Sequence, residues 1–99
     1  MLISSQRYLN DEIVEAKRAA KDYEVMISPE FVFEGETYQI ILDGHHSYAA
    51  AMADGVDPEY YEADASDHDA LLLDDPHDLL DATQIDSEYY NVETGIDLW

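Results

Sequence analysis

Residues 38–55 read YQIILDGHHSYAAAMADG, a segment that by itself contains a strand, a turn and a helix. Its first five residues place an apolar side chain at every second position, which predicts a β-strand with one buried face. Gly44 ends the strand, and the alanine-rich segment after it predicts a helix over 45–54 that Gly55 closes in a left-handed cap. We expect five side chains of this unit to be mainly buried: Tyr38, Ile40, Leu42, Tyr48 and Met52.

Two further elements precede this unit. A helix is predicted over about 10–21, with Asn10 as its N-cap, because apolar side chains recur there at helical spacing. These apolar residues are Leu9, Ile13, Ala16 and Ala20. After the helix, the alternation of Val25 and Ile27 predicts a strand, which a loop joins to the strand described above.

The chain after Gly55 is predicted to hold a short strand and two short helices. The strand covers Glu59–Glu62, and the helices lie near 67–73 and 76–83, with Ser66 and Asp75 as plausible N-caps. The leucines that we expect to face the core are Leu71, Leu72, Leu79 and Leu80. The tail holds two adjacent tyrosines and a terminal tryptophan, a large aromatic area that is expected to pack against the domain.

These elements predict the α+β class: one small domain over 1–99, in which a short mixed sheet with helices precedes an acidic, leucine-rich helical segment and aromatic tail over 65–99. The 99 residues, 46% of them hydrophobic, suffice for one core and not for two domains. No apolar run approaches the roughly 20 residues of a membrane-spanning helix, and the N-terminus lacks an export-signal pattern, so we expect a cytoplasmic protein without a membrane partner.

The charge is large and unevenly distributed. The chain has 24 acidic and 4 basic residues, a formal net charge of −20. All four cations lie in the first 21 residues, at Arg7, Lys17, Arg18 and Lys21. Such a field repels nucleic acid and attracts basic proteins, so we expect no direct DNA or RNA binding. A simpler interpretation is that the charge serves solubility or adaptation to high salt.

The turn DGHHSYAA, residues 43–50, places the first N–H groups of a helix where they can hold an anion. It resembles the turn of the ParB/sulfiredoxin-like superfamily, in which a Gly-x-x-Arg type turn precedes a helix that binds nucleotide phosphate. The matching residues are Asp43, Gly44, His45, His46, Tyr48 and Ala49. The resemblance covers residues 1–64 and implies a ParB-like core. Ser47 stands where many relatives have arginine, which removes the planar cation that clamps phosphate.

The candidate anion-binding residues of this turn are Asp43, Gly44, His45, His46 and Ser47. If the chain is a nucleotide-binding or phosphotransfer protein, the resemblance implies that Asp43, His45 and His46 are the residues that act on the phosphate. Alternatively, one histidine packs or caps the helix start and the other is solvated. Adjacent helical residues point about 100° apart and rarely share a metal, and the chain has no cysteine, so neither a metal site nor a cofactor is predicted.

The hypothesis that we favour from the sequence is a nucleic-acid mimic without catalytic residues. Acids three or four positions apart on a helix form lines of charge that can imitate a phosphate backbone. The predicted partner-binding residues are Asp67, Asp69, Asp74, Asp75, Asp78 and Asp81. The composition is similar to that of small acidic phage and plasmid proteins that block CRISPR complexes or restriction enzymes, which implies a basic nucleic-acid-binding protein as partner. A salt-adapted acidic adaptor without mimicry is the third alternative.

Overall fold

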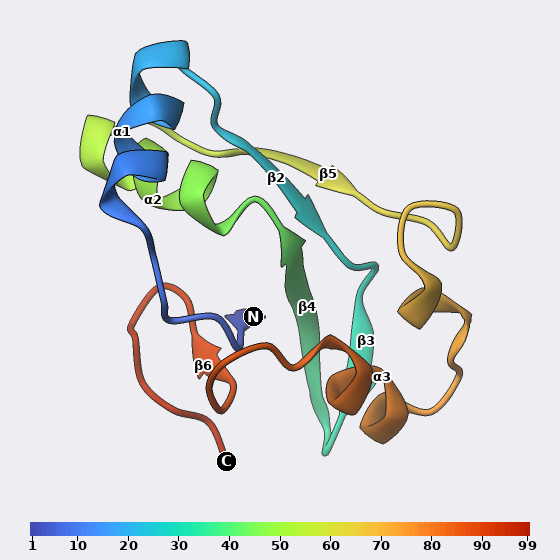
Figure 1. The fold of residues 1–99 in the computed structure, drawn as a ribbon. Helices are drawn as coiled ribbons and strands as arrows, with labels where there is room; N and C mark the ends of the chain where they lie inside the picture. The colour runs from blue at the N-terminus through green and yellow to red at the C-terminus, as the bar shows by residue number, and fades with distance from the viewer.

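The computed structural model describes residues 1–99 and builds an α+β fold around a mixed six-stranded sheet (Figure 1). The expected fold class is therefore confirmed. The elements in chain order are β1 (Leu2–Ser4), α1 (Asp11–Ala20), β2 (Glu24–Ile27), β3 (Phe31–Phe33), β4 (Glu36–Asp43), α2 (His45–Asp54), β5 (Glu59–Glu62), the 3₁₀ helix η1 (Asp69–Leu72), α3 (Pro76–Thr83) and β6 (Tyr90–Asn91). None of the helices combines the length and apolar character needed to cross a membrane.

The sheet has the order β5-β2-β4-β1-β6, and β3 pairs separately with β4. The central strand β4 runs parallel to β1 and antiparallel to β2 and β3, while β5 runs parallel to β2. The strands expected near Val25, over 38–42 and over Glu59–Glu62 are confirmed. The strands β1, β3 and β6 were not predicted, because strands of two or three residues are too short to show a period.

The two faces of the sheet are covered by different segments. One face carries Val25 and Ile41, which are buried on the side of α2 together with Ala50 and Ala51. The opposite face packs against α3, η1 and the C-terminal tail in a cluster of ten buried residues. This core consists of Ile3, Phe33, Tyr38, Ile40, Leu42, Ala63, Ala70, Leu79, Leu80 and Tyr89. Successive residues of β4 therefore serve two separate apolar layers.

Burial along the strand–turn–helix unit departs from expectation only in the helix. Tyr38, Ile40 and Leu42 are buried as expected, whereas Tyr48 is half-buried. The expectation for Met52 is wrong, because its side chain is 50% exposed. The reason is that α2 turns Ala50 and Ala51, together with His45 and Ser47, toward the sheet and leaves Met52 on the outer side.

The acidic C-terminal segment contains the predicted helices, although one is shorter. Asp75 caps α3 as expected, since its carboxylate accepts the His77 N–H at 2.8 Å. The helix expected near 67–73 is the single-turn η1, whose N-cap is His68 instead of Ser66. Leu79 and Leu80 are buried and Leu71 is partly buried, but the expectation for Leu72 is wrong: it is 68% exposed. A single 3₁₀ turn cannot direct all three consecutive leucines inward.

The first helix packs with the side that holds Val14, Lys17 and Arg18, which are its only half-buried residues. Asn10 caps α1 as predicted by accepting the N–H groups of Glu12 and Ile13. No residue of α1 is buried, and Ile13 in its apolar stripe is 43% exposed. Contact with α2 includes an ion pair between Arg18 and Asp54 at 2.7 Å. The apolar period thus predicted the helix correctly without showing which side packs.

Candidate functional site

The turn between β4 and α2 requires a glycine because another strand lies against it. Gly44 has a φ of 91°, and a Cβ at this position would lie 2.5 Å from the Glu24 carbonyl oxygen and 2.9 Å from the Val25 Cα. Both atoms belong to the backbone and cannot rotate away. The Gly44 N–H donates to Asp43 Oδ1 at 2.7 Å. Close packing against β2 therefore accounts for this glycine without a bound anion.

His45 is a buried, uncharged residue that connects α2 to β1. Its Nε2 lies 2.7 Å from Ser4 Oγ, and both residues are buried. Burial lowers the pKa of His45 from 6.5 to about 4, although the carboxylate of Asp43 opposes this shift. At neutral pH the ring therefore carries no charge with which to attract a phosphate.

His46 points to a different part of the chain. Its Nε2 accepts the Asn10 N–H at 3.1 Å, so the ring joins the first turn of α2 to the start of α1. The alternative in which one histidine packs and the other is solvated describes His45 but not His46, which is half-buried and hydrogen-bonded. No group of three or more histidine, aspartate or glutamate side chains in the structure is arranged to hold a metal ion. The two imidazoles thus stabilise the contacts of α2 with β1 and with the segment before α1.

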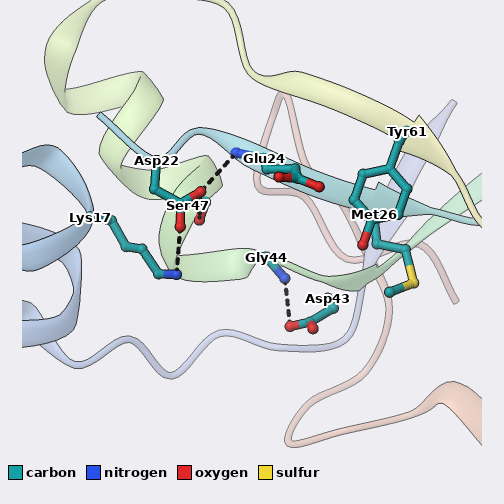
Figure 2. Close-up of a pocket in the computed structure, with 8 residues that line it drawn as sticks. All are labelled: Lys17, Asp22, Glu24, Met26, Asp43, Gly44, Ser47 and Tyr61. Atoms are coloured by element: carbon teal, nitrogen blue, oxygen red, sulfur yellow. Dashed lines mark hydrogen bonds and ion pairs between the residues drawn. The ribbon is translucent and has the colours of Figure 1, made fainter. Parts of the chain in front are cut away.

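A shallow hollow of about 170 Å³ lies beside the turn (Figure 2). It is lined by Lys17, Asp22, Glu24, Met26, Asp43, Gly44, Ser47 and Tyr61. Three of these side chains are carboxylates and one is an ammonium group. The hollow therefore has a negative balance of charge, which disfavours a phosphate ligand.

The only cation in the hollow is already neutralised by the protein. Lys17 Nζ donates to Asp22 Oδ2 at 2.8 Å, and Asp22 Oδ1 lies 3.4 Å from the Ser47 hydroxyl that donates to it. The hydrogen bond with Lys17 and the N–H of Glu24 hold the pKa of Asp22 below its usual range (Figure 2). Ser47 is buried and directed at this carboxylate, so it does not replace the missing arginine as an anion ligand.

The six aspartates predicted to bind a partner, called the acidic surface below, are all exposed. The acidic surface consists of Asp67, Asp69, Asp74, Asp75, Asp78 and Asp81. Two of its members also stabilise local backbone: Asp75 caps α3, and Asp67 Oδ2 accepts the Asp64 N–H at 3.0 Å. The other four carboxylates make no hydrogen bond or ion pair with the protein. Asp78 and Asp81, three positions apart in α3, have Cβ atoms roughly 5–6 Å apart.

No cation compensates the acidic surface. The ion pairs of the protein join Arg7 to Asp97, Lys17 to Asp22, and Arg18 to Glu15 and Asp54. Each of these partners lies outside the acidic surface. The structure therefore pairs Arg7, Lys17 and Arg18 with carboxylates elsewhere in the chain and leaves the carboxylates of η1 and α3 free in solvent.

Three features of these sites were not predicted from the sequence. They are the Ser4–His45 contact, the Lys17–Asp22 pair beside the turn, and the position of β5 at the edge of the sheet. The Ser4–His45 contact spans 41 positions of sequence, and no local pattern encodes it. The two consecutive serines in LISSQ, at residues 4 and 5, were the only sign of a polar contact beneath the helix.

Comparisons with protein-family models, with curated proteins and with solved structures found no match for this chain. The resemblance to the ParB/sulfiredoxin-like superfamily therefore stays a prediction. Function is inferred from the charge and geometry of the chain itself.

Proposed function

We propose that this protein is an acidic inhibitor that binds the basic surface of a nucleic-acid-binding protein in place of nucleic acid. One observation carries the proposal. Four carboxylates of the acidic surface have no partner within the protein, and no basic residue follows Lys21. The unpaired carboxylates are those of Asp69, Asp74, Asp78 and Asp81.

The unpaired carboxylates have a cost in folding free energy. Like charges on one small domain repel each other and destabilise the compact state. Interspersed lysine or arginine residues would relieve this repulsion, yet the chain has none after Lys21. A field of this kind accelerates association with a positively charged surface and repels negatively charged ones. The charge distribution therefore supports a basic protein as the partner and does not support nucleic acid.

The nucleotide-binding alternative has weaker support. At the turn, Lys17 is paired with Asp22, His45 is neutral and buried, and Asp43 and Glu24 add negative charge. The only lysine or arginine around the hollow is thus already paired, and the carboxylates beside it disfavour a phosphate.

The test begins with capture of partners from a bacterial lysate by the tagged protein, with washes at increasing salt concentration. Affinity for the captured partner is then measured with and without a short DNA or RNA duplex as competitor. We expect nucleic acid and this protein to exclude each other, and affinity to fall between about 50 mM and about 500 mM NaCl because screening weakens exposed charges. A ternary complex with nucleic acid would contradict mimicry.

A charge-matched pair of variants locates the interface. The test variant carries Asp69→Asn, Asp74→Asn, Asp78→Asn and Asp81→Asn, which leaves the caps at Asp67 and Asp75 intact. The control variant changes net charge equally at exposed acids elsewhere: Asp11→Asn, Glu12→Gln, Glu30→Gln and Glu93→Gln.

At about 0.5 kcal/mol for each contact, the test variant should bind roughly 30-fold more weakly. The control should lose only a few-fold. Equal losses in both variants would mean that net charge alone drives binding, as expected of a salt-adapted adaptor.

A further inference from the structure

The strand β5 forms a free edge of the sheet. It pairs only with β2, and all four of its residues are exposed. Figure 1 shows β5 at the border of the sheet, leading directly into the loop that carries η1. The strand therefore adjoins the segment that holds the acidic surface.

The backbone of β5 has unused hydrogen-bonding groups. The N–H groups of Glu59 and Ala63 donate to the carbonyl oxygens of Tyr23 and Ile27, both at 2.8 Å. In a parallel pair, alternate residues of a strand direct their N–H and C=O groups to the same neighbour. The backbone groups of Tyr60 and Glu62 therefore point away from β2. A row of unpaired groups on an exposed edge is a template for an additional strand.

The side chains of β5 select the charge of a strand that could pair there. The sequence of β5 is EYYE, with Glu59 at one end and Glu62 at the other, and Asp57 and Asp64 flank the strand. Pairing with a second copy of β5 would bring glutamates toward glutamates, which is unfavourable across a sheet. A strand with lysine or arginine side chains would instead form opposite-charge pairs.

The two tyrosines suit the same kind of strand. Tyr60 is 46% exposed and Tyr61 is 39% exposed, and as neighbours in a strand they lie on opposite faces of the sheet. An exposed aromatic ring offers apolar area for the aliphatic part of a lysine or arginine and attracts its cationic end. Each face of the edge thus presents one tyrosine and one glutamate.

We infer that β5 accepts an extended lysine- or arginine-rich segment of a partner protein as an added strand. The inference rests on the proposed function, because it takes the basic partner from there and assigns the contact that fixes its position. The acidic surface attracts the partner, and backbone pairing along β5 orients one of its segments. A partner segment that is not extended cannot form this backbone pairing, and one that is not basic lacks the opposite-charge pairs.

The probe for this inference is the peptide Lys-Val-Lys-Thr-Lys-Val-Lys, acetylated and amidated at its ends. Its control has the same residues in alternating L and D configuration, which keeps the charge but prevents regular strand pairing. We expect the first peptide to bind about tenfold more tightly. Equal affinities would overturn the inference.

A matched pair of protein variants tests the edge itself. Tyr60→Pro removes the outward N–H and spares the ladder with β2, whereas Tyr60→Thr removes the same ring and keeps the N–H. Affinity for the all-L peptide should fall about tenfold further in Tyr60→Pro than in Tyr60→Thr. Similar affinities in the two variants would overturn the inference.

Hydrogen exchange on the unmodified protein provides a readout that does not depend on whether Tyr60→Pro folds. The amides of Tyr60 and Glu62 should exchange rapidly in the free protein and at least tenfold more slowly with saturating peptide, while Tyr61 changes little. Unchanged exchange at Tyr60 and Glu62 would overturn the inference.

A captured lysate partner separates the two proposals. If it is lost in the fourfold aspartate variant but binds Tyr60→Pro and Tyr60→Thr equally, the assignment of β5 fails and the proposed function stands. If the peptide protects both amides but no captured partner competes with nucleic acid, the proposed function fails at its own test.

Discussion

Lowering the pH from about 7 to about 4 should destabilise the protein through His45. Its ring is buried and lies 2.7 Å from Ser4 Oγ, and burial lowers its pKa to about 4. In the unfolded chain the pKa returns to about 6.5. Between these two values the unfolded state binds the additional proton, so stability falls as the pH falls. The contribution is fully present above pH 6.5 and is lost as the pH passes through 4.

The size of the effect follows from the difference between the two pKa values. One pKa unit corresponds to about 1.4 kcal/mol, so a shift from 6.5 to about 4 gives a loss of roughly 3 kcal/mol for His45. Such a loss is a large part of the 5–15 kcal/mol by which domains are usually stable, about a fifth or more. Protonation of the 24 acidic residues relieves repulsion over part of the same range, so the effect of His45 must be isolated by substitution.

The substitution His45→Gln isolates the effect of His45 protonation on stability, because the glutamine amide can reach Ser4 but does not titrate. His77→Gln is the control, since His77 is exposed and makes no side-chain hydrogen bond, although its ring packs edge-on against Phe33 with centroids 4.8 Å apart. Urea unfolding is followed by the fluorescence of Trp99, whose ring lies 5.3 Å from that of Phe33. The free energy of unfolding should fall by roughly 3 kcal/mol more in the unmodified protein and in His77→Gln than in His45→Gln. The same pH dependence in all three proteins would refute the assignment.

Two further predictions concern packing. Gly44→Ala should lower the free energy of unfolding by about 3 kcal/mol or more, because its Cβ would collide with the Glu24 carbonyl. Gly55→Ala should lower it by only about 1 kcal/mol, since nothing lies within 4 Å of the added Cβ. Urea unfolding of both variants checks this, and equal losses would argue against close packing of β2 on the turn. Leu80→Ala should cost about 2–5 kcal/mol, while Leu72→Ala should change stability by less than about 0.5 kcal/mol, as measured by thermal unfolding. A larger loss from Leu72→Ala would indicate that η1 packs with a different side inward.

Prediction from the sequence succeeded where neighbouring residues control the structure. The strand ending at Asp43, the turn at Gly44 and the helix closed by Gly55 were all predicted from local period and backbone preference. The caps at Asn10 and Asp75 depend on N–H groups two or three residues away, and both were predicted. The conformation of these elements depends on residues close together in the sequence, which is why they could be recognised from it.

Prediction was weaker for the side of each helix that packs. Met52 and Leu72 were expected in the core and are exposed, and the apolar stripe of α1 that contains Ile13 faces solvent. Apolar character shows which side chains can be buried, but burial also needs a facing surface. The side of α1 that faces α2 includes Arg18, which pairs with Asp54, 36 positions along the chain.

By itself the sequence determined the charge of this protein and where that charge changes along the chain. No arrangement of the backbone can place a cation after Lys21, because none is encoded there. Only the tertiary structure decided that His45 is buried against Ser4, that Lys17 is neutralised by Asp22, and that β5 lies at a free edge. These features depend on contacts between segments far apart in sequence. Composition is a sum over residues, whereas exposure, ion pairing and strand order exist only once distant segments have packed.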